Sequence, residues 1–413
     1  MVRADIPFDD QIALLMRGVS FGDAAIAASM EAELRQRLAE SHATGKPLRV
    51  YLGVDPTSTD IHLGHTVPLR KLRQFQDLGH DVVFLIGSFT ALIGDPSDKD
   101  KARPRLTRER VREHARTYVD QVARILDPER TTIDYNDRWL APLSFADVID
   151  LASRFTVQQF LTRDNFAQRF ASGDPIWLHE FFYALMQAYD AVMLRTDVQV
   201  GGTEQLFNLM AGRKLMEAMG MRPQVCLTLP ILVGTDGHMR MSKSAGNAIG
   251  IAEPPEEQYG KVMSMPDEAM RNVAELVTRW TPAEIDRLLG EVEAGTLHPR
   301  DAKMRLALEI VDILHGAEAA ERAQEHFATV FQQRELPAEM PSLSLDGPTA
   351  LVDVIVAAGM ATSKSQARRL VTQGGVRLDG EAVEDVDAMV EARGQVLQVG
   401  RRRYVRLVGA GMR

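Results

Sequence analysis

Two short motifs in the sequence could together handle the phosphate groups of a nucleotide. His62-Leu63-Gly64-His65 places two imidazoles and a glycine where a predicted strand gives way to a predicted helix, and Met241-Ser242-Lys243-Ser244 places a lysine on a predicted loop. The start of a helix favours anions because its backbone N–H groups have no partner within the helix. The pair suits a reaction in which charge builds up on phosphates, so that positioning and fixed charge supply most of the catalysis.

The elements around the first motif are predicted to form a parallel strand–helix–strand unit. Residues 48–54 have the pattern of a strand, and apolar residues recur at helical spacing over 69–78, with Gly79 as a cap. Pro68 would lie in the first turn of this helix, where its missing N–H is harmless. Residues 81–87 form a continuous apolar run, which is typical of a strand buried on both faces.

Farther along the chain, a strand is predicted over residues 225–233, leading into the second motif, and helices are predicted over 107–126, 144–169 and 178–194. Residues from about 255 to 333 are charged and helix-rich. The proline-containing stretch 335–348 is predicted to be a linker.

The C-terminal segment carries a second set of candidate residues. Ser363 and Gln366 have capping-box spacing and predict a helix start. Asp379-Gly380 predicts a hairpin turn, and a basic strand is expected over 401–407. This order resembles the S4 RNA-binding domain, in which the exposed basic residues would contact RNA: Lys364, Arg368, Arg369, Arg401, Arg402 and Arg403. From this segment alone, RNA binding and a solvated charged surface are equally good interpretations; the upstream motifs favour RNA binding.

Composition limits the possibilities. The chain has 413 residues, a net charge of −9 and one cysteine, so disulfides within the chain are excluded and a reducing compartment, the cytoplasm, is expected. No signal peptide or membrane-spanning run is apparent, and no cluster has zinc-ligand spacing. The acidic balance argues against indiscriminate nucleic-acid binding, DNA included, but residues from 349 onward carry a net charge of +3, which predicts that this part meets a polyanion.

Over almost its entire length, the chain resembles the bacterial tyrosyl-tRNA synthetases, which are class I aminoacyl-tRNA synthetases. The segments that carry the resemblance are Tyr51–Thr57, His62–His65, Ile93–Pro96, Tyr183–Asp190, Gly201–Gln205 and Met241–Ser244. The resemblance implies a Rossmann-like catalytic domain (1–250), an α-helical middle domain (251–334) and, after the linker, an S4 domain (349–413). The catalytic domain would include an N-terminal helical extension (1–46) and an inserted, dimer-forming region (about 130–200).

The resemblance also implies a tyrosine pocket. Tyr51 and Asp190 match positions that meet the phenol hydroxyl of the substrate, since a carboxylate accepts its proton and a tyrosine hydroxyl donates back. Asp95, Tyr183, Gln187 and Gln205 match positions around the amino acid, where a carboxylate balances the ammonium group. The plainer interpretation is that Tyr183 only packs in the core, but this leaves Gln187 and Asp190 on the same helix face unexplained.

For ATP, the resemblance implies roles along the whole nucleotide. His62, His65, Thr57, Lys99 and Lys243 would act on the phosphates during catalysis, although single histidines and lysines are more often simply solvated. The remaining ATP-binding residues would be Gly53, Asp55, Gly64, Gly202, Glu204, Arg240, Met241 and Ser242. Two of them depart from the family pattern, because Glu204 replaces the usual aspartate and Arg240 the usual lysine.

The expected reaction is the formation of tyrosyl-adenylate from L-tyrosine and ATP, followed by transfer of tyrosine to tRNA(Tyr), by a homodimer. Mg²⁺ is expected to arrive with ATP rather than in a protein site. Two alternatives are a tryptophan-specific enzyme of the same fold and a non-catalytic RNA-binding relative. The C-terminal domain and the Tyr51–Asp190 pair argue against the first, and the intact motifs argue against the second.

Overall fold

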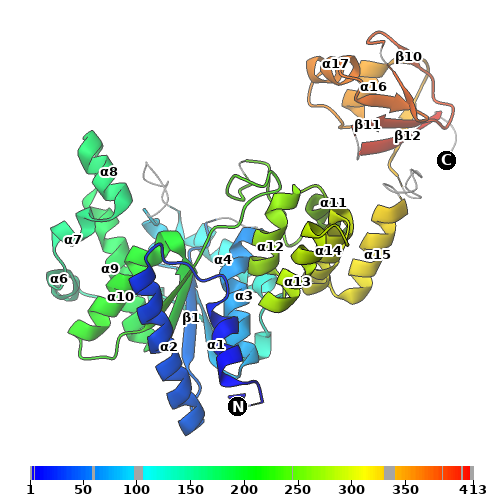
Figure 1. The fold of residues 1–413 in the computed structure, drawn as a ribbon. Helices are drawn as coiled ribbons and strands as arrows, with labels where there is room; N and C mark the ends of the chain where they lie inside the picture. The colour runs from blue at the N-terminus through cyan, green and yellow to red at the C-terminus, as the bar shows by residue number, and fades with distance from the viewer. Residues whose placement is uncertain are drawn as a thin grey trace. The chain divides into compact units, whose positions relative to one another are not determined.

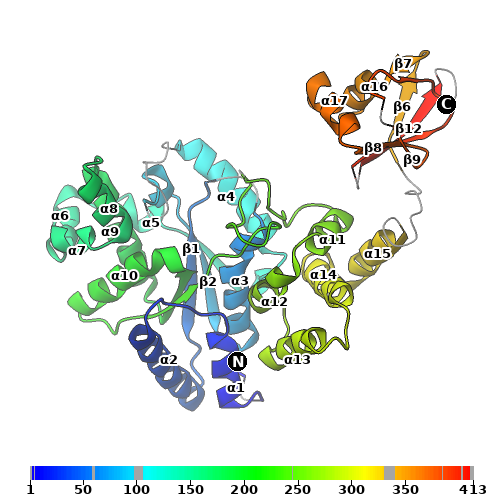
Figure 2. The ribbon, with the colours of Figure 1, turned by 45° about the horizontal axis from the view of Figure 1, so that its top comes forward.

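The computed structural model describes residues 2–3, 5–57, 61–96, 106–243, 245–329, 340–383, 385–400 and 403–409. The chain divides into two compact units, Met1–Phe327 and Ala328–Arg413, and each is described by itself (Figures 1 and 2). None of the described helices is long and apolar enough to cross a membrane.

The first unit is built on a parallel five-stranded sheet in the order β3-β2-β1-β4-β5. The strands are β1 (Arg49–Val54), β2 (Asp81–Ile86), β3 (Thr131–Tyr135), β4 (Val198–Gly202) and β5 (Val225–Leu229). From β1 the chain winds outward to β2 and β3, then returns to place β4 on the other side of β1. The carboxyl ends of β1 and β4 thus border a topological switch point, which is where ligands bind in open α/β sheets.

Both faces of the sheet are buried. Successive side chains of a strand point to opposite sides, so each strand contributes to two cores. In β1, Val50 and Leu52 join the core that includes α3 (Leu63–Asp77), whereas Tyr51 joins the core formed by α9 (Leu178–Leu194) and α10 (Leu206–Ala218). The alternation in β2 is the same. The predicted α/β class with a Rossmann-like parallel sheet is confirmed.

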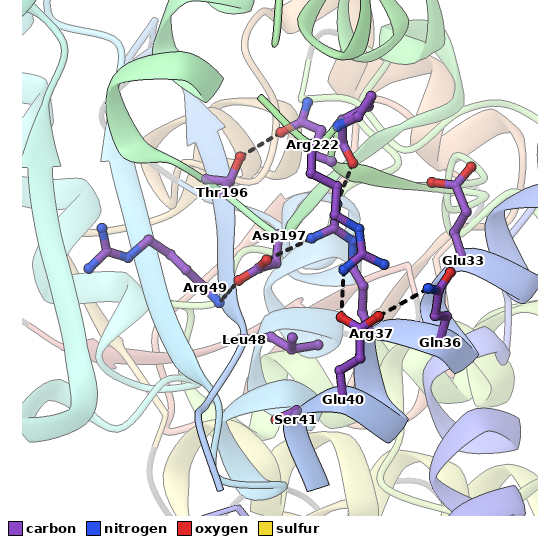
Figure 3. A network of polar contacts seen from close by, with 12 residues as sticks. Glu33, Gln36, Arg37, Glu40, Ser41, Leu48, Arg49, Thr196, Asp197 and Arg222 are labelled. Atoms are coloured by element: carbon purple, nitrogen blue, oxygen red, sulfur yellow. Dashed lines mark hydrogen bonds and ion pairs between the residues drawn. The ribbon is translucent and has the colours of Figure 1, made fainter. Parts of the chain in front are cut away.

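The N-terminal helices are α1 (Phe8–Met16) and α2 (Ala24–Thr44). The second of them, α2, is bonded to the amino ends of two strands. The buried guanidinium of Arg37 on α2 bonds Asp197 Oδ1 at 2.7 Å and the carbonyl of Pro223, while Asp197 Oδ2 accepts the backbone N–H of Arg49 at 2.9 Å (Figure 3). One carboxylate therefore links α2 to the starts of β1 and β4.

Three predicted elements of the first unit are shorter than expected. The helix predicted over 107–126 is α4 (Arg108–Val122). The strand predicted over 225–233 ends at Leu229, because Pro230 has no N–H to donate to a neighbouring strand. The single helix predicted over 144–169 is three helices: α6 (Phe145–Ser153), α7 (Val157–Leu161) and α8 (Asp164–Ser172). Thr156 and Gln159 form a capping box that starts α7, so the chain cannot continue as one helix through this point.

The remaining helices of the first unit include α5 (Asp137–Leu140) and short 3₁₀ turns, among them η1 (Thr90–Leu92) and η3 (Thr203–Gln205). The helical region contains α11 (Pro255–Met263), α12 (Met270–Val277), α13 (Pro282–Glu293), α14 (Pro299–His315) and α15 (Ala317–Phe327). Its buried side chains belong to the same core as α3. The predicted middle domain is therefore continuous with the catalytic region.

The second unit has a five-stranded sheet in the order β6-β12-β11-β8-β9 and a two-stranded β7–β10 sheet. Its elements are β6 (Ser342–Leu345), β7 (Thr349–Ala350), α16 (Leu351–Ala357), α17 (Lys364–Thr372), β8 (Val376–Leu378), β9 (Glu381–Ala382), β10 (Met389–Val390), β11 (Val396–Val399) and β12 (Arg403–Gly409). Residues 342–345 were predicted to be linker, which is wrong. Serine and leucine alternate in this segment, as in a strand. Leu345 is buried, and β6 pairs in parallel with β12.

Candidate active site

A cavity of about 230 Å³ opens at the switch point of the sheet. It collects predicted residues from distant parts of the chain: Tyr51, Gly53, Asp55, Thr57, His65, Asp95, Tyr183, Gln187, Asp190, Gly202, Glu204, Gln205 and Arg240. We call it the sheet cavity. Because they come from β1, α3, α9, β4, η3 and the loops between them, only the folded sheet brings them together.

At one end of the sheet cavity lie a buried carboxyl, that of Asp190, and a buried hydroxyl, that of Tyr51. Asp190 Oδ1 accepts the indole N–H of Trp139 at 2.7 Å, and Oδ2 accepts an amide N–H of Asn136 at 3.2 Å. Tyr51 is fully buried, and among the described residues its hydroxyl forms no hydrogen bond of normal geometry, although the side chain of Gln224 lies near enough to lower its pKa. A buried hydroxyl beside an accepting carboxylate is suited to a ligand that carries its own hydroxyl.

Burial controls the ionisation of this end. It raises the pKa of Asp190 to about 8, although the hydrogen bonds from Trp139 and Asn136 pull the pKa down. Burial also raises the pKa of the Tyr51 phenol well above its ordinary value, and the negative charge of Asp190 adds to this rise. Tyr51 is therefore a neutral donor at neutral pH.

A second polar cluster surrounds Asp95 on the loop after β2. Its Oδ2 accepts the amide of Gln205 at 2.6 Å, and its Oδ1 lies 3.5 Å from the guanidinium of Arg163. Gln205 in turn accepts an amide N–H of Asn208 at 2.9 Å. No motif singles out Arg163, which lies in the loop between α7 and α8 and becomes notable only because the fold buries it.

Tyr183 and Asp55 were predicted to serve different substrates, yet the Tyr183 hydroxyl donates to Asp55 Oδ2 at 3.0 Å. Asp55 Oδ1 accepts the hydroxyl of Thr90 at 2.7 Å. Gly87 lies against this carboxylate so closely that a Cβ there would be 1.9 Å from Asp55 Oδ1. Glycine is therefore required at position 87, which the sequence alone did not reveal.

The first phosphate motif forms the start of α3, but not as expected. His62 is the N-cap, and its Nδ1 accepts the N–H of Gly64 at 3.1 Å; its own N–H donates to His65 Nδ1 at 3.3 Å. The N–H of Leu63 donates to the carbonyl of Ile249. These backbone donors are thus already used, and since α3 begins at Leu63, Pro68 lies inside the helix rather than in its first turn.

The two imidazoles remain as donors. Each Nδ1 accepts a hydrogen bond, so each neutral ring carries its proton on Nε2. The rings lie 3.9 Å apart between centroids. Burial lowers the pKa of His62 to about 4 and that of His65 to about 3, and the nearby positive charges of Lys243 and Arg240 contribute to both shifts. At neutral pH the pair consists of uncharged N–H donors.

A second cavity, of about 150 Å³, adjoins the sheet cavity. Both are lined by His65, Gly202, Glu204 and Arg240, and the second also by His62, Gly64 and Met241. We call it the histidine cavity. At Gly202 a Cβ would lie 2.2 Å from the carboxylate of Glu204, so the longer side chain present in this sequence folds back over the glycine.

The loop of the second motif is organised by Asn247, which sequence reasoning missed. Its Oδ1 accepts the N–H of Ser242 at 2.8 Å, and its amide donates to Asp236 at 2.5 Å and to the carbonyl of Arg240 at 3.1 Å. Asn247 is buried. Lys243 lies on this loop but lines neither cavity, and its charge acts on His62.

Some predicted residues lie elsewhere. Lys99, Arg401 and Arg402 fall outside the described residues. On α17, Lys364, Arg368 and Arg369 are all exposed, with Lys364 paired to Asp353 at 2.7 Å.

The predicted capping box of α17 forms only in part. Ser363 accepts the N–H of Gln366, but the Gln366 side chain accepts from Thr362 instead. The predicted hairpin turn is confirmed by positive φ at both Asp379 and Gly380. Arg403 donates to the carbonyl of Met360, a contact within the unit.

Comparison with known proteins agrees with this geometry. The family model "tRNA synthetases class I (W and Y)" matches residues 43–332, and "Tyrosine--tRNA ligase SYY-like C-terminal domain" matches residues 332–406. The chain is 52% identical over 399 residues to the tyrosine--tRNA ligase of Moorella thermoacetica, covering 96% of this chain and 95% of the relative. The ligase of Thermotoga maritima is 50% identical over 402 residues, covering 97% and 98%.

The chain belongs to the tyrosine--tRNA ligase family. Among solved structures, tyrosyl-tRNA synthetase of Archaeoglobus fulgidus, complexed with L-tyrosine, is 25% identical with a TM-score of 0.59, covering 77% of this chain and all of that one. A truncated mitochondrial enzyme from Aspergillus nidulans shares the fold, with a TM-score of 0.64, 24% identity, and coverage of 78% and 94%. The family's two matched regions meet at residue 332, close to the boundary between the two compact units.

Proposed function

We propose that this protein is a tyrosine--tRNA ligase that forms tyrosyl-adenylate from L-tyrosine and ATP and transfers the tyrosyl group to tRNA(Tyr). The carboxylate of tyrosine attacks the α-phosphorus of ATP, and pyrophosphate leaves. The terminal ribose hydroxyl of the tRNA then attacks the tyrosyl carbonyl, releasing AMP. The observation that carries the proposal is the buried Tyr51–Asp190 end of the sheet cavity, in a chain about half identical to curated ligases along nearly its whole length.

In this proposal the sheet cavity holds tyrosine. The phenol hydroxyl donates to Asp190 and accepts from Tyr51, which pairs the buried Tyr51 hydroxyl. Asp95, with Gln205 on its other oxygen, faces the substrate ammonium, and Gln187 lines the same cavity. Tyr183 lines the same cavity and donates its hydroxyl to the Asp55 carboxylate.

The histidine cavity would hold part of ATP, and the phosphates would extend toward Thr57 in the adjoining sheet cavity. His62 and His65 donate from Nε2 to phosphate oxygens without adding charge, and Arg240 and Lys243 supply the positive charge. The Gly53, Gly64 and Gly202 backbones allow close approach of the nucleotide, while Glu204, Met241 and Ser242 complete the wall, with Lys99 assigned to the same phosphates. Mg²⁺ would arrive on the phosphate oxygens of ATP, which it prefers as hard ligands.

The test is pyrophosphate exchange with each amino acid in turn. Exchange that requires tyrosine, with phenylalanine and tryptophan far poorer, supports the proposal. Phenylalanine would leave the Tyr51 hydroxyl without its ligand partner and would remove one donor from Asp190, which keeps its bonds from Trp139 and Asn136. At about 1–3 kcal/mol for each loss, the discrimination would be about 30-fold to 10⁴-fold. Asp190→Ala should lose part of this discrimination. Exchange driven by tryptophan, or an Asp190→Ala variant as selective as the parent, contradicts it.

The inserted region is proposed to form a homodimer interface. Large apolar side chains are exposed on α6, α8 and the start of α9: Phe145 (80% exposed), Ile149 (54%), Phe170 (69%), Trp177 (55%) and Leu178 (71%). An exposed apolar set of this size marks an interaction site. Leu178→Glu should give a monomer in analytical ultracentrifugation, whereas a dimer unaffected by it would place the interface elsewhere.

We also propose that the exposed cations of α17 bind tRNA(Tyr), as do Arg401, Arg402 and Arg403, and that the protein works in the cytoplasm, where its tRNA substrate is found. Phosphate contacts of this kind weaken steeply with salt. Reversing Arg368 to glutamate should therefore reduce tRNA charging and its salt dependence while leaving pyrophosphate exchange unchanged.

A further inference from the structure

A third cavity, of about 370 Å³, lies between α4, α5 and the end of β3. Its charged lining is one-sided: Arg108, Arg112, Arg116 and Arg138 against the single carboxylate of Asp137. The chain as a whole is acidic, with a net charge of −9. We call this feature the arginine cavity.

The arginines form a row because of their spacing on α4. Arg108, Arg112 and Arg116 follow at intervals of four residues, which places them on one face of the helix, about 6 Å apart along its axis. All three are exposed, and within the described part of the chain none of them forms an ion pair. Arg138 is paired with Asp134 at 2.6 Å, and Asp137 is tied to the hydroxyl of Ser88 at 2.8 Å.

The arginine cavity is back to back with the sheet cavity. Along the segment after β2, Gly87 and Thr90 line the sheet cavity, whereas Ser88, Phe89 and Leu92 line the arginine cavity. The same division occurs after β3, where Asn136 faces the sheet cavity and its neighbours Tyr135 and Asp137 face the other. These two segments separate the cavities.

We propose that the arginine cavity binds the sugar–phosphate backbone of the tRNA acceptor arm, close to the 3′ end that must enter the sheet cavity. A row of guanidinium groups about 12 Å long suits successive phosphates of a chain better than one small anion. The exposed ring of Tyr135, beside the guanidinium groups, offers a surface on which an unpaired base can stack. This inference rests on the proposed function, because it takes tRNA as the substrate.

The test uses charge reversal at two positions of the same helix. Arg112 lines the arginine cavity, whereas Arg110 is exposed on α4 but does not line it. Arg112→Glu and Arg110→Glu therefore change the net charge equally. The probe is an acceptor-stem minihelix of tRNA(Tyr), ending in CCA and lacking the anticodon arm, titrated against the full-length protein at several salt concentrations.

We expect Arg112→Glu to weaken minihelix binding at least about tenfold and to reduce the slope of log K against log salt by about 0.9 for each lost phosphate contact. Arg110→Glu should bind within about twofold of the parent. Pyrophosphate exchange should be unchanged in both variants. Loss of tyrosine-dependent exchange in the parent protein would instead be a failure of the proposed function.

Three results would overturn the inference. Equal weakening by both variants would reduce it to a general charge effect. Unchanged minihelix binding in Arg112→Glu, with weaker binding of intact tRNA, would place the contact elsewhere on the tRNA. If Arg112→Glu also slows pyrophosphate exchange, Arg116→Glu, one helical turn along α4, decides: normal exchange with weakened minihelix binding supports the inference, and any other result contradicts it.

Discussion

Tyrosine binding should release a proton at neutral pH, because of the environment of Asp190. Burial raises the pKa of this carboxyl to about 8 in the free protein. A phenol hydroxyl that donates to the carboxylate favours its charged form, so tyrosine should bind preferentially to the ionised state. A group of pKa 8 is about 1% ionised at pH 6 and half ionised at pH 8, and linkage then predicts about fiftyfold tighter binding at pH 8 than at pH 6.

The assay is isothermal titration calorimetry in pairs of buffers with different ionisation enthalpies. At pH 7 the parent should release close to one proton per tyrosine bound. Asp190→Asn keeps the size of the side chain but cannot ionise, so its affinity, weaker overall, should lose this pH dependence and the associated proton. Titration of the ligand itself affects both proteins alike and cancels in the comparison. A parent protein that releases no proton and binds equally well at pH 6 and pH 8 would refute the reasoning.

Four further predictions follow from the site. Lys243→Ala should slow adenylate formation by about 10²- to 10³-fold while the Kd for tyrosine, from equilibrium titration, stays within about twofold; an equal loss of tyrosine affinity would contradict it. Asn247→Ala should slow the same step at least about tenfold by releasing the N–H of Ser242, again with tyrosine binding intact. Glu204→Asp should leave the KM for ATP unchanged or lower, and a large fall in the activation rate would show that the longer side chain over Gly202 is matched to its surroundings. Residues 1–340 contain the whole first unit, so this fragment should keep pyrophosphate exchange and charge tRNA poorly; undiminished charging would contradict the role assigned to the second unit.

Three strands of the parallel sheet, β1, β2 and β5, could be predicted because each is a short, mostly apolar run. β3 (Thr131–Tyr135) and β4 (Val198–Gly202) were not predicted, because polar residues or glycines interrupt their apolar pattern. α9 was predicted with its observed bounds, Leu178–Leu194, since Gly and Pro are absent from it. The predicted boundaries of helices and strands were wrong where a capping residue or a proline overrides the hydrophobic periodicity. Thr156 and Gln159 start a new helix inside an amphipathic stretch, and the prolines after α15 concealed the strand at 342–345.

Within the site, the residues that were missed act through tertiary contacts. Trp139 and Asn136 bond Asp190 from a segment that has no motif, and Asn247 holds the loop from beyond the Met-Ser-Lys-Ser sequence. Gly87 needs to be glycine only because Asp55 lies against it. Such roles depend on which distant segment the fold places against each residue, and local sequence patterns do not predict these tertiary contacts.

The two histidines and Asp190 change their charge in different pH ranges. His62 and His65 titrate near pH 4 and 3, so between pH 6 and 8 they stay neutral and donate from Nε2. Asp190 titrates at about 8, inside that window. A pH dependence of activation in this range should therefore appear in the apparent affinity for tyrosine and be lost in Asp190→Asn, because His62 and His65 keep one charge state throughout.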